Sequence, residues 1–365
     1  MNKLIVVIGA GPAGLCASIE AAKLGAKVLL LDENLKPGGQ LFKQIHKFFG
    51  SKEHLAGVRG FDIGRKLLEE AKKLNIEVSL KTEVLGIDKD KNIWAIQNGK
   101  KSIHIKADRI ILATGAMEKP ISFPGWTLPG VMGAGAVQTM MNLHRVLPGK
   151  RVVMLGSGNV GVITAYQLLQ AGADVIAILE AGPYLGAYGV HTAKLSRLGV
   201  PFYTSCTIKE AVGKKYIEVI KTVKLDKNWK YIKGTEKILS VDTVCIATGL
   251  TPITELAWIV GCEFVYVKNL GGHIPIHNEY METTVKGIYV AGDIAGVEEA
   301  STAMDEGRLA GIHAAASLGF LRKGEKIKRI KEVWDRLDAL RLGSFGKKRK
   351  EAKEYIINIG RRLIR

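Results

Sequence analysis

The sequence predicts an α/β fold of two parallel-sheet domains, followed by a basic helical extension. Three observations lead to this prediction. A strand–glycine turn–helix–strand unit that ends in an acid occurs twice, at residues 3–33 and 151–180. A strand that ends in Ala-Thr-Gly follows each unit, and a last strand ends in Gly-Asp. At roughly 150 residues per domain, 365 residues make two or three domains.

The first unit starts with the apolar run 4–8, which is typical of a buried parallel strand. A G-x-G-x-x-G segment at 9–14 and a helix of small residues follow it. A second strand at 27–31 then ends in Asp32 and Glu33. Asp32 lies 18 residues beyond the last glycine of the turn, close to the ~20 residues expected for an acid that binds a ribose hydroxyl.

The second unit repeats this order. Strand 152–155 enters a G-x-G-x-x-G segment at 156–161, and a helix and strand 175–179 follow. Glu180 ends that strand, 19 residues beyond the last glycine. The same spacing of glycines and acid therefore predicts a second site of the same kind.

The three glycines of such a turn have different roles. The first allows a tight bend, the second lets a pyrophosphate lie against bare backbone, and the third lets the helix pack close to the strand. The N–H groups and the dipole of the helix then bind the phosphates. One such pattern is weak evidence, whereas two complete units predict two dinucleotide sites. The alternative for the second unit is a fold that has lost its nucleotide.

Three later segments connect the two units. The strands at 110–115 and 244–249 both end in Ala-Thr-Gly, where we expect the chain to cross between domains. The strand at 287–293 ends in Gly-Asp, and a helix of small residues is expected at 301–316. A Thr-x-x-Asp sequence at 302–305 has capping-box spacing near the start of that helix.

With these motifs, the chain resembles the flavoproteins with two dinucleotide-binding domains, the pyridine nucleotide–disulfide oxidoreductase superfamily, over about residues 1–320. The resemblance implies a Rossmann-like FAD-binding domain at 1–117 and 250–320. A Rossmann-like NAD(P)-binding domain at 118–249 would be inserted between its halves. Residues 321–365 would form a helical basic C-terminal extension.

The resemblance also implies which residues bind the cofactors. In the family, the first turn binds FAD, the next acid holds the adenosine ribose, and the late Gly-Asp pair contacts the ribityl-phosphate region. The expected FAD-binding residues are Gly9, Gly11, Pro12, Ala13, Gly14, Asp32 or its alternative Glu33, Gly38, Gly39, Gln40, Ala113, Thr114, Gly115, Gly292, Asp293 and Ala300. The expected NADH-binding residues are Gly156, Gly158, Asn159, Val160, Gly161, Glu180, Ala247, Thr248 and Gly249. The candidates in the flavin loop are Gln40 and His46.

No catalytic residue is assigned with certainty, because the flavin itself carries the chemistry. Two cysteines near the flavin would be needed for a disulfide reductase. No two cysteines of this chain form a C-x-x-C pair, and their spacing predicts no metal site. We expect them to be small core residues in a reducing cytoplasm. They are Cys16, Cys206, Cys245 and Cys262.

Segments 129–138 and 291–307 are similar to the flavoprotein subunits of dye-linked proline dehydrogenases, opine oxidases, hydrogen cyanide synthases and sarcosine oxidase (α subunit), which work in complexes. The resemblance implies an FAD-dependent oxidoreductase subunit that passes electrons between NADH and another acceptor. One alternative is an amino-acid or amine dehydrogenase subunit whose second site holds a structural nucleotide or is vestigial. Another is a non-enzymatic binding module. The expected partners are other dehydrogenase subunits, among them an iron–sulfur or catalytic subunit, or further copies of the chain.

The chain has a net charge of +18, of which residues 321–365 contribute +10. Apolar residues recur there at helical spacing, among them Ile330, Trp334 and Leu337. This stripe needs a surface to cover, either the FAD domain of the chain itself or a second subunit. A second helix is expected after Gly346.

Basic charge alone does not indicate nucleic acid, and the sequence has no module that reads it, so no nucleic-acid partner is expected. The uncharged run 152–173 is long enough to cross a membrane. It contains glycines and polar residues, however, and fits a strand, a turn and a buried helix better. We therefore expect no membrane span and a cytoplasmic protein.

Overall fold

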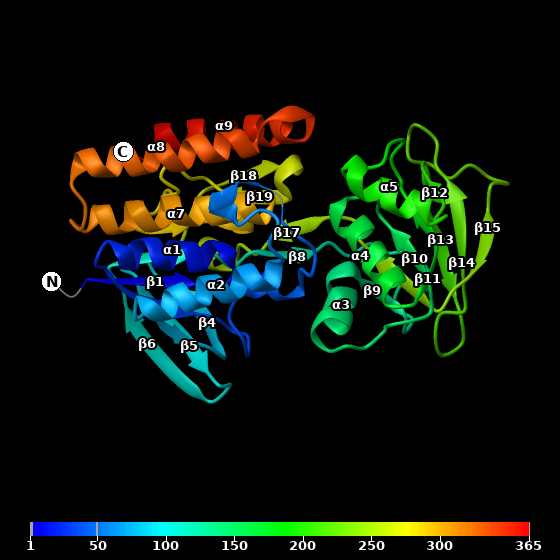
Figure 1. Cartoon of the computed structure of the whole chain (residues 1–365), viewed down its shortest axis with the longest axis horizontal. Helices are drawn as coiled ribbons and strands as arrows, with labels where there is room; N and C mark the ends of the chain where they lie inside the picture. Colours follow the sequence, from blue (N-terminus) through cyan, green and yellow to red (C-terminus); the bar gives the residue numbers. More distant parts are fainter. Residues whose placement is uncertain (1–2, 49, 365) are drawn as a thin grey trace. The chain divides into compact units, whose positions relative to one another are not determined.

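The computed structural model describes residues 3–48 and 50–364, with only the backbone of Ser344 and Phe345. Residues 1, 2, 49 and 365 of the predicted domains lie outside this description. The chain divides into two compact units. The first contains the residues up to Met117 and those from Thr251 onward, and the second is Glu118–Leu250. The chain thus leaves the first unit once and returns to it once (Figure 1).

The first unit is built on a parallel sheet of strand order β20-β7-β1-β2-β3. Its strands β1 and β7 are almost wholly buried, which explains their continuous apolar sequences. The elements before the chain leaves the unit are β1 (Leu4–Ile8), α1 (Pro12–Lys23), β2 (Lys27–Leu31), η1 (Gly39–Lys43), η2 (Lys52–His54), α2 (Gly60–Lys73), β3 (Glu77–Ser79), β4 (Thr82–Ile87), β5 (Asn92–Gln97), β6 (Lys101–Lys106) and β7 (Arg109–Leu112). Strands β4, β5 and β6 form a separate antiparallel sheet.

The returning part of this unit contains the strand that completes the sheet and three long helices. Its elements are α6 (Glu255–Ile259), β18 (Phe264–Val267), η4 (Lys268–Leu270), β19 (Gly272–Pro275), β20 (Ile288–Val290), η5 (Gly292–Ala295), α7 (Ala300–Ser317), α8 (Lys323–Leu340) and α9 (Gly343–Leu363). Two short strands, β8 (Ala116–Glu118) and β17 (Leu250–Pro252), pair where the chain leaves and returns.

The second unit repeats the topology of the first. Its parallel sheet has the order β12-β11-β10-β16-β9, so β10 lies between β11 and β16 just as β1 lies between β2 and β7. Strands β13, β14 and β15 form an antiparallel sheet beside it. The elements are β9 (Val131–Gly133), α3 (Ala134–Gln138), η3 (Thr139–Leu143), β10 (Arg151–Leu155), α4 (Asn159–Gln170), β11 (Asp174–Leu179), α5 (Gly189–Arg197), β12 (Phe202–Tyr203), β13 (Cys206–Val212), β14 (Val219–Lys224), β15 (Lys237–Ser240) and β16 (Thr243–Ile246). The predicted α/β fold with parallel sheets is confirmed.

Helices α1 and α7 lie side by side with their backbones in contact (Figure 1). A Cβ at Gly307 would overlap the carbonyl oxygen of Ala13, and one at Gly311 would overlap that of Ala17. The four-residue spacing in both helices places each pair on one helical face. The small residues of both helices are therefore explained by this close approach, which places the middle of α7 against the start of α1.

The predicted capping box at the start of α7 does not form. The helix starts at Ala300 with Glu299 as its N-cap residue, and the hydroxyl of Thr302 donates to the Glu299 carbonyl oxygen at 2.6 Å. Asp305 is fully buried and contacts the side chains of Arg308 and Arg336. The carboxylate that local spacing assigned to the cap therefore pairs instead with Arg308, three residues on, and with the distant Arg336 of α8.

The C-terminal extension packs on the first unit. The apolar stripe of α8 is buried at Ile330 and Leu337, and the indole N–H of Trp334 donates to the Glu279 carbonyl oxygen at 3.1 Å. The second helix begins at Gly343 rather than after Gly346. A Cβ at Gly346 would overlap the backbone of Arg341, so that glycine lies inside α9 where the two helices touch. The stripe thus covers the chain's own fold.

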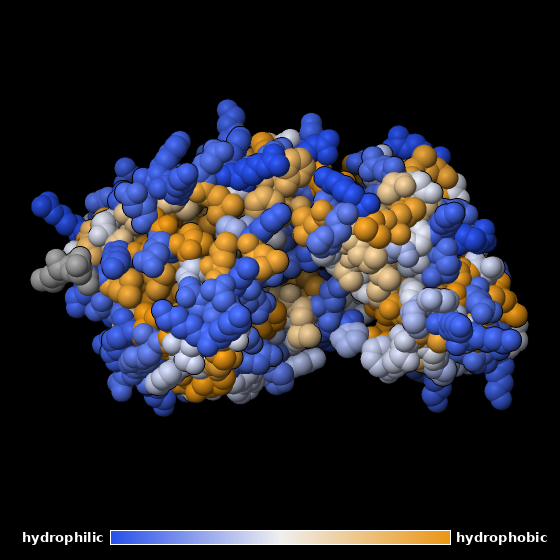
Figure 2. All heavy atoms as spheres, turned by 90° about the horizontal axis from the view of Figure 1, so that it is seen from below, coloured by the Kyte–Doolittle hydropathy of each residue, from blue (hydrophilic) through white to orange (hydrophobic). Residues whose placement is uncertain are grey.

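The surface is largely hydrophilic on the face drawn in Figure 2, with apolar patches between the charged side chains. Within the described parts of the chain, no helix combines the length and the apolar character that a membrane crossing requires. The uncharged run at 152–173 forms β10, the glycine turn and α4 instead.

Candidate functional site

The first glycine turn has the geometry of a phosphate-binding cradle. Gly9 has a φ of 105°, and a Cβ there would overlap the carbonyl oxygen of Ala113. A Cβ at Gly14 would overlap the carbonyl oxygen of Gly9. At Gly11, by contrast, no described atom outside the adjoining residues lies within 4 Å of the position that a Cβ would take. The first and third glycines are thus required by the fold, and the second leaves open space at the start of α1.

The acid at the end of β2 holds this turn. One carboxylate oxygen of Asp32 accepts the Ala10 N–H at 2.7 Å, and the other accepts the backbone and side-chain N–H groups of Asn34 at 2.8 and 2.9 Å. Asp32 is buried, whereas Glu33 is exposed. Asp32 is therefore well placed to orient the turn, and Glu33 faces solvent beside it.

The loop after β2 lies against the cradle. The Gly38 N–H donates to the Ala10 carbonyl oxygen at 2.7 Å, and a Cβ at Gly39 would lie 2.8 Å from the Cα of Gly11. Gln40 follows on η1 and is exposed. His46 is half-buried and stacks on Phe48, with ring centroids 5.6 Å apart. The structure thus brings the two loop glycines to the turn, whereas Gln40 faces solvent and His46 packs on Phe48.

The late Gly-Asp pair also reaches the start of α1. A Cβ at Gly292 would lie 2.8 Å from the Cβ of Ala13. Asp293 follows on η5, and one of its carboxylate oxygens accepts the Glu298 N–H at 3.4 Å. Burial raises the pKa of Asp293 to about 7, although this hydrogen bond favours the carboxylate. Gly292 therefore lies against Ala13 in the first turn of α1 with Asp293 next to it, and Ala300 starts α7 seven residues after Asp293.

The two Ala-Thr-Gly segments make matching contacts. The hydroxyl of Thr114 donates to the Ile253 carbonyl oxygen at 2.7 Å, and that of Thr248 donates to the Lys119 carbonyl oxygen at 3.0 Å. In both segments the threonine thus ties the end of a sheet strand to the chain's other crossing segment. The alanine carbonyl oxygens lie against the first glycine of each turn, and the threonine hydroxyls donate to backbone carbonyl oxygens.

The second glycine turn is a close copy of the first. Cβ atoms at Gly156 and Gly161 would overlap the carbonyl oxygens of Ala247 and Gly156, respectively. At Gly158, nothing in the described chain approaches the Cβ position to within 4 Å. The carboxylate of Glu180 accepts the Ser157 N–H at 3.0 Å and the Gly182 N–H at 2.8 Å. Asp32 and Glu180 thus each accept the N–H of the second residue of their turn and the N–H two residues after the acid.

The second site has one feature that its spacing did not predict. The buried hydroxyl of Ser157 donates to Glu180 at 2.5 Å and accepts the Gly186 N–H at 2.9 Å. The side-chain oxygen of Asn159 accepts the Tyr188 N–H at 3.0 Å. The loop after β11 is therefore held across the turn, while Val160 in the first turn of α4 remains exposed. In the sequence, the polar residues Ser157 and Asn159 inside the glycine motif were the signal that could have predicted this loop contact.

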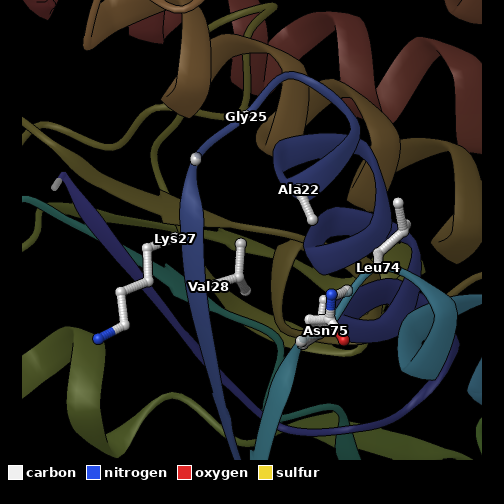
Figure 3. Close-up of a pocket in the computed structure, with 8 residues that line it drawn as sticks. Ala22, Gly25, Lys27, Val28, Leu74 and Asn75 are labelled. Carbon is white, nitrogen blue, oxygen red and sulfur yellow. The ribbon is translucent and has the colours of Figure 1, made fainter. Parts of the chain in front are cut away.

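Two of the cavities in the first unit lie at opposite ends of its parallel sheet. One of about 470 Å³ lies at the carboxyl end of β2 and is lined by residues that include Glu33, Asn34 and Lys81. Another of about 220 Å³ lies at the amino end of β2, between Ala22, Lys27 and the turn at Leu74 and Asn75 (Figure 3). Since ligands of such sheets bind at the carboxyl ends of the strands, the first of these two cavities adjoins the site and the second does not.

Buried thiols play no part in this arrangement. All four cysteines are free and buried in the described structure. Burial raises the pKa of Cys16 to about 12 and that of Cys245 higher still, which keeps both thiols protonated. Among the described residues, no three His, Cys, Asp or Glu side chains are grouped to hold a metal ion.

Comparisons with known proteins agree with this geometry. The family model "Pyridine nucleotide-disulphide oxidoreductase" matches residues 3–307. One of the opine oxidase subunits of Agrobacterium tumefaciens is 31% identical, over 86% of this chain and 65% of its own. Hydrogen cyanide synthase subunit HcnB of Pseudomonas aeruginosa is 26% identical, over 93% of this chain and 77% of its own. Thioredoxin reductase of T. acidophilum has the same fold, with a TM-score of 0.71 and 22% identity over 86% of this chain and 98% of its own. The chain thus spans just under two thirds of the opine oxidase relative, with 65% of its length covered.

Proposed function

Since the chain belongs to the pyridine nucleotide-disulphide oxidoreductase family, we propose that it is the flavoprotein subunit of a multi-subunit dehydrogenase. It is an FAD-dependent oxidoreductase of a family that binds FAD and NAD(P). In the proposed reaction, electrons pass between NADH and a second acceptor through FAD. This membership argues against the alternative of a non-enzymatic binding module.

The first unit fits FAD. The open space at Gly11 would take the pyrophosphate, because a side chain there would fill it and the first N–H groups of α1 lack helical partners. Asp32 would accept a ribose hydroxyl with its one remaining lone pair, on the oxygen that accepts Ala10, and the cavity at Glu33 and Asn34 has room for the adenosine end. Asp293 would face the ribityl-phosphate part. Bound FAD supplies the redox chemistry, and the chain binds and orients it.

The second unit fits NADH. The observation that carries this proposal is the repeated geometry of the two turns: open space at Gly158, and an acid, Glu180, on the same two backbone groups. A carboxylate at this position accepts ribose hydroxyls and repels a 2′-phosphate. Residues 181–183 are Ala-Gly-Pro, without an arginine that could bind that phosphate. We therefore propose NADH rather than NADPH as the nucleotide.

The test is an anaerobic titration of the purified yellow protein. NADH should bleach the flavin absorption, and an equal concentration of NADPH should act at least about tenfold more slowly. A tenfold difference in rate corresponds to about 1.4 kcal/mol in activation free energy. Faster bleaching by NADPH would contradict the role of Glu180. A colourless protein that takes up no added FAD would contradict the proposed function as a whole.

A second candidate function is an amino-acid or amine dehydrogenase subunit whose second unit holds a structural nucleotide or none. The loop held across the second turn by Ser157 and Asn159 supports this candidate, because it lies where a nucleotide would enter. The opine oxidase relative is also named for an oxidised substrate. Bleaching by proline, an opine or sarcosine, but not by NADH, would favour this candidate.

We also propose that the chain works in a complex. Both curated relatives described above are named as subunits. A second subunit, carrying an iron–sulfur centre or a catalytic site, would then take the electrons, although further copies of this chain are the alternative. Purification from the native cell at low and high salt, followed by mass determination, separates the two arrangements.

A further inference from the structure

Helix α7 contains a buried acid that is neutralised by the C-terminal helices. Glu306 is 3% exposed. One of its carboxylate oxygens accepts the guanidinium of Arg341 at 2.9 Å and the ammonium of Lys353 at 2.6 Å. Arg341 comes at the end of α8 and Lys353 from α9, and both are buried as well. Two of the many basic side chains in the C-terminal extension are thus buried and paired with Glu306.

The same three groups reach the turn that carries the Gly-Asp pair. The second carboxylate oxygen of Glu306 accepts the Gly292 N–H at 3.2 Å, and the ammonium of Lys353 donates to the Ala295 carbonyl oxygen at 2.7 Å. Gly292 and Ala295 are the first and last residues of η5, which contains Asp293. Contacts from α7 and α9 therefore hold both ends of this one short helical turn.

The ammonium of Lys353 lies at the carbonyl end of η5. The carbonyl end of a helical turn is electronegative, and an ammonium there is favourable. The side chain leaves α9 between well-packed neighbours: Ile356 is fully buried, and a Cβ at Gly296 would lie 3.3 Å from the Cε of Lys353. Its position is therefore fixed by packing as well as by charge.

We propose that Lys353 is a positioning residue for the flavin site, acting through η5 on Asp293. This inference rests on the proposed function, since it assumes that η5 faces FAD. Lys353 touches neither the cradle at Gly11 nor a reacting atom. It holds the Ala295 end of the turn while Glu306 holds the Gly292 end, so that Asp293 meets the ribityl-phosphate part of FAD in one fixed orientation.

Two effects of Lys353 need to be separated: it neutralises Glu306, and it holds Ala295. Lys353→Met removes both. Lys353→Met combined with Glu306→Gln restores the charge balance, because Arg341 keeps its bonds to Glu298 at 3.0 and 3.1 Å. The amide oxygen in Glu306→Gln can still accept the Gly292 N–H, so that only Ala295 is left unheld. Lys350→Met is the matched control, since Lys350 lies on the same helix and pairs with Asp338 at the surface.

The measurement is the dissociation constant of FAD from the apo-protein, by flavin fluorescence, together with the melting temperature of each apo-variant. Hydrogen bonds from charged groups are among the stronger ones in proteins, so Lys353→Met should weaken FAD binding at least about tenfold. The double variant should regain melting temperature and still bind FAD weakly. Lys350→Met should change neither quantity.

An unchanged FAD dissociation constant in the double variant would overturn the inference, because only the charge balance would then matter. An unchanged constant in Lys353→Met would overturn it as well. Asp293→Ala distinguishes this failure from that of the proposed site. If Asp293→Ala binds FAD as wild type does, then η5 does not face the flavin. If Asp293→Ala loses FAD while the double variant keeps it, the site stands and the role of Lys353 is refuted.

Discussion

A methyl group placed at the second glycine of each turn tests both nucleotide sites with the smallest change that the chain allows. Gly11 has φ −74° and ψ −174°, and Gly158 has φ −67° and ψ 171°, both of which alanine adopts easily. Apart from the residues directly before and after each glycine, nothing in the described residues lies within 4 Å of either added methyl group. Gly11→Ala and Gly158→Ala should therefore fold like the wild type while they fill the space proposed for a pyrophosphate.

An alanine at either position has two opposite effects on folding stability, and they nearly cancel. Alanine is a poorer N-cap than glycine, at a cost of about 0.5–1 kcal/mol, and it stabilises through the unfolded chain by about 0.4–1 kcal/mol. A bound pyrophosphate would lose at least two hydrogen bonds from backbone N–H groups. At about 1.5 kcal/mol or more for each bond to a charged group, the affinity should fall more than about 100-fold. Binding should thus change and folding should not.

The assay pairs apo-protein melting temperatures with two titrations. Gly11→Ala should bind FAD more than about 100-fold more weakly at an unchanged melting temperature. Gly158→Ala should keep its FAD and require far more NADH for bleaching. Gly9→Ala provides the contrast, because its φ of 105° and the overlap with Ala113 should prevent stable folding. Wild-type FAD affinity in Gly11→Ala would refute the phosphate cradle, and wild-type response to NADH in Gly158→Ala would refute the second site.

Three further predictions concern the rest of the fold. Although burial alone would raise the pKa of Asp305, bonds from His54 and Arg336 and the charge of Arg308 hold it at about 2. Its contribution to stability, about 2 kcal/mol, is therefore present above pH 4 and lost as the pH falls toward 2. The stability of Asp305→Asn should lack this part of its dependence on pH, and a pH dependence identical to that of the wild type would count against the ion pairs of Asp305. Replacing all four cysteines by alanine should leave flavin reduction intact, and lost reduction at full flavin content would reveal a redox thiol. Removing residues 343–365 should lower both the melting temperature and the flavin content, because Glu306 loses Lys353; an unchanged truncated protein would contradict this.

The glycine turns could be predicted because their signal is local. A turn, its helix and the acid lie within about 25 residues, and sterics alone fix which glycines are needed. Asp32 and Glu180 were found in this way, and their equivalent bonds to the turns follow from the repeated spacing. The paired role of Thr114 and Thr248 was visible as a repeated motif, but its hydrogen bonds were not.

The residues that sequence reasoning missed depend on partners far along the chain. His54 meets Asp305 across 251 positions, and Lys353 meets Glu306 across 47. No periodicity encodes such a pair, so local spacing gave Asp305 a capping role that it does not have. The loop across the second turn was missed for a related reason: the spacing of the glycines around Ser157 says nothing about a loop that begins more than 20 residues later.

The split of the first unit has a consequence for how the protein is made. Residues 118–250 form a compact unit of their own and leave the ribosome before the strand β20 that completes the other sheet. The inserted unit can therefore fold during synthesis, whereas its host waits with β7 exposed at an open edge. Asp293 is made after that unit, and Lys353 on α9 is made later still. Cofactor loading should thus come late in the maturation of this chain, once η5 and α9 have been made.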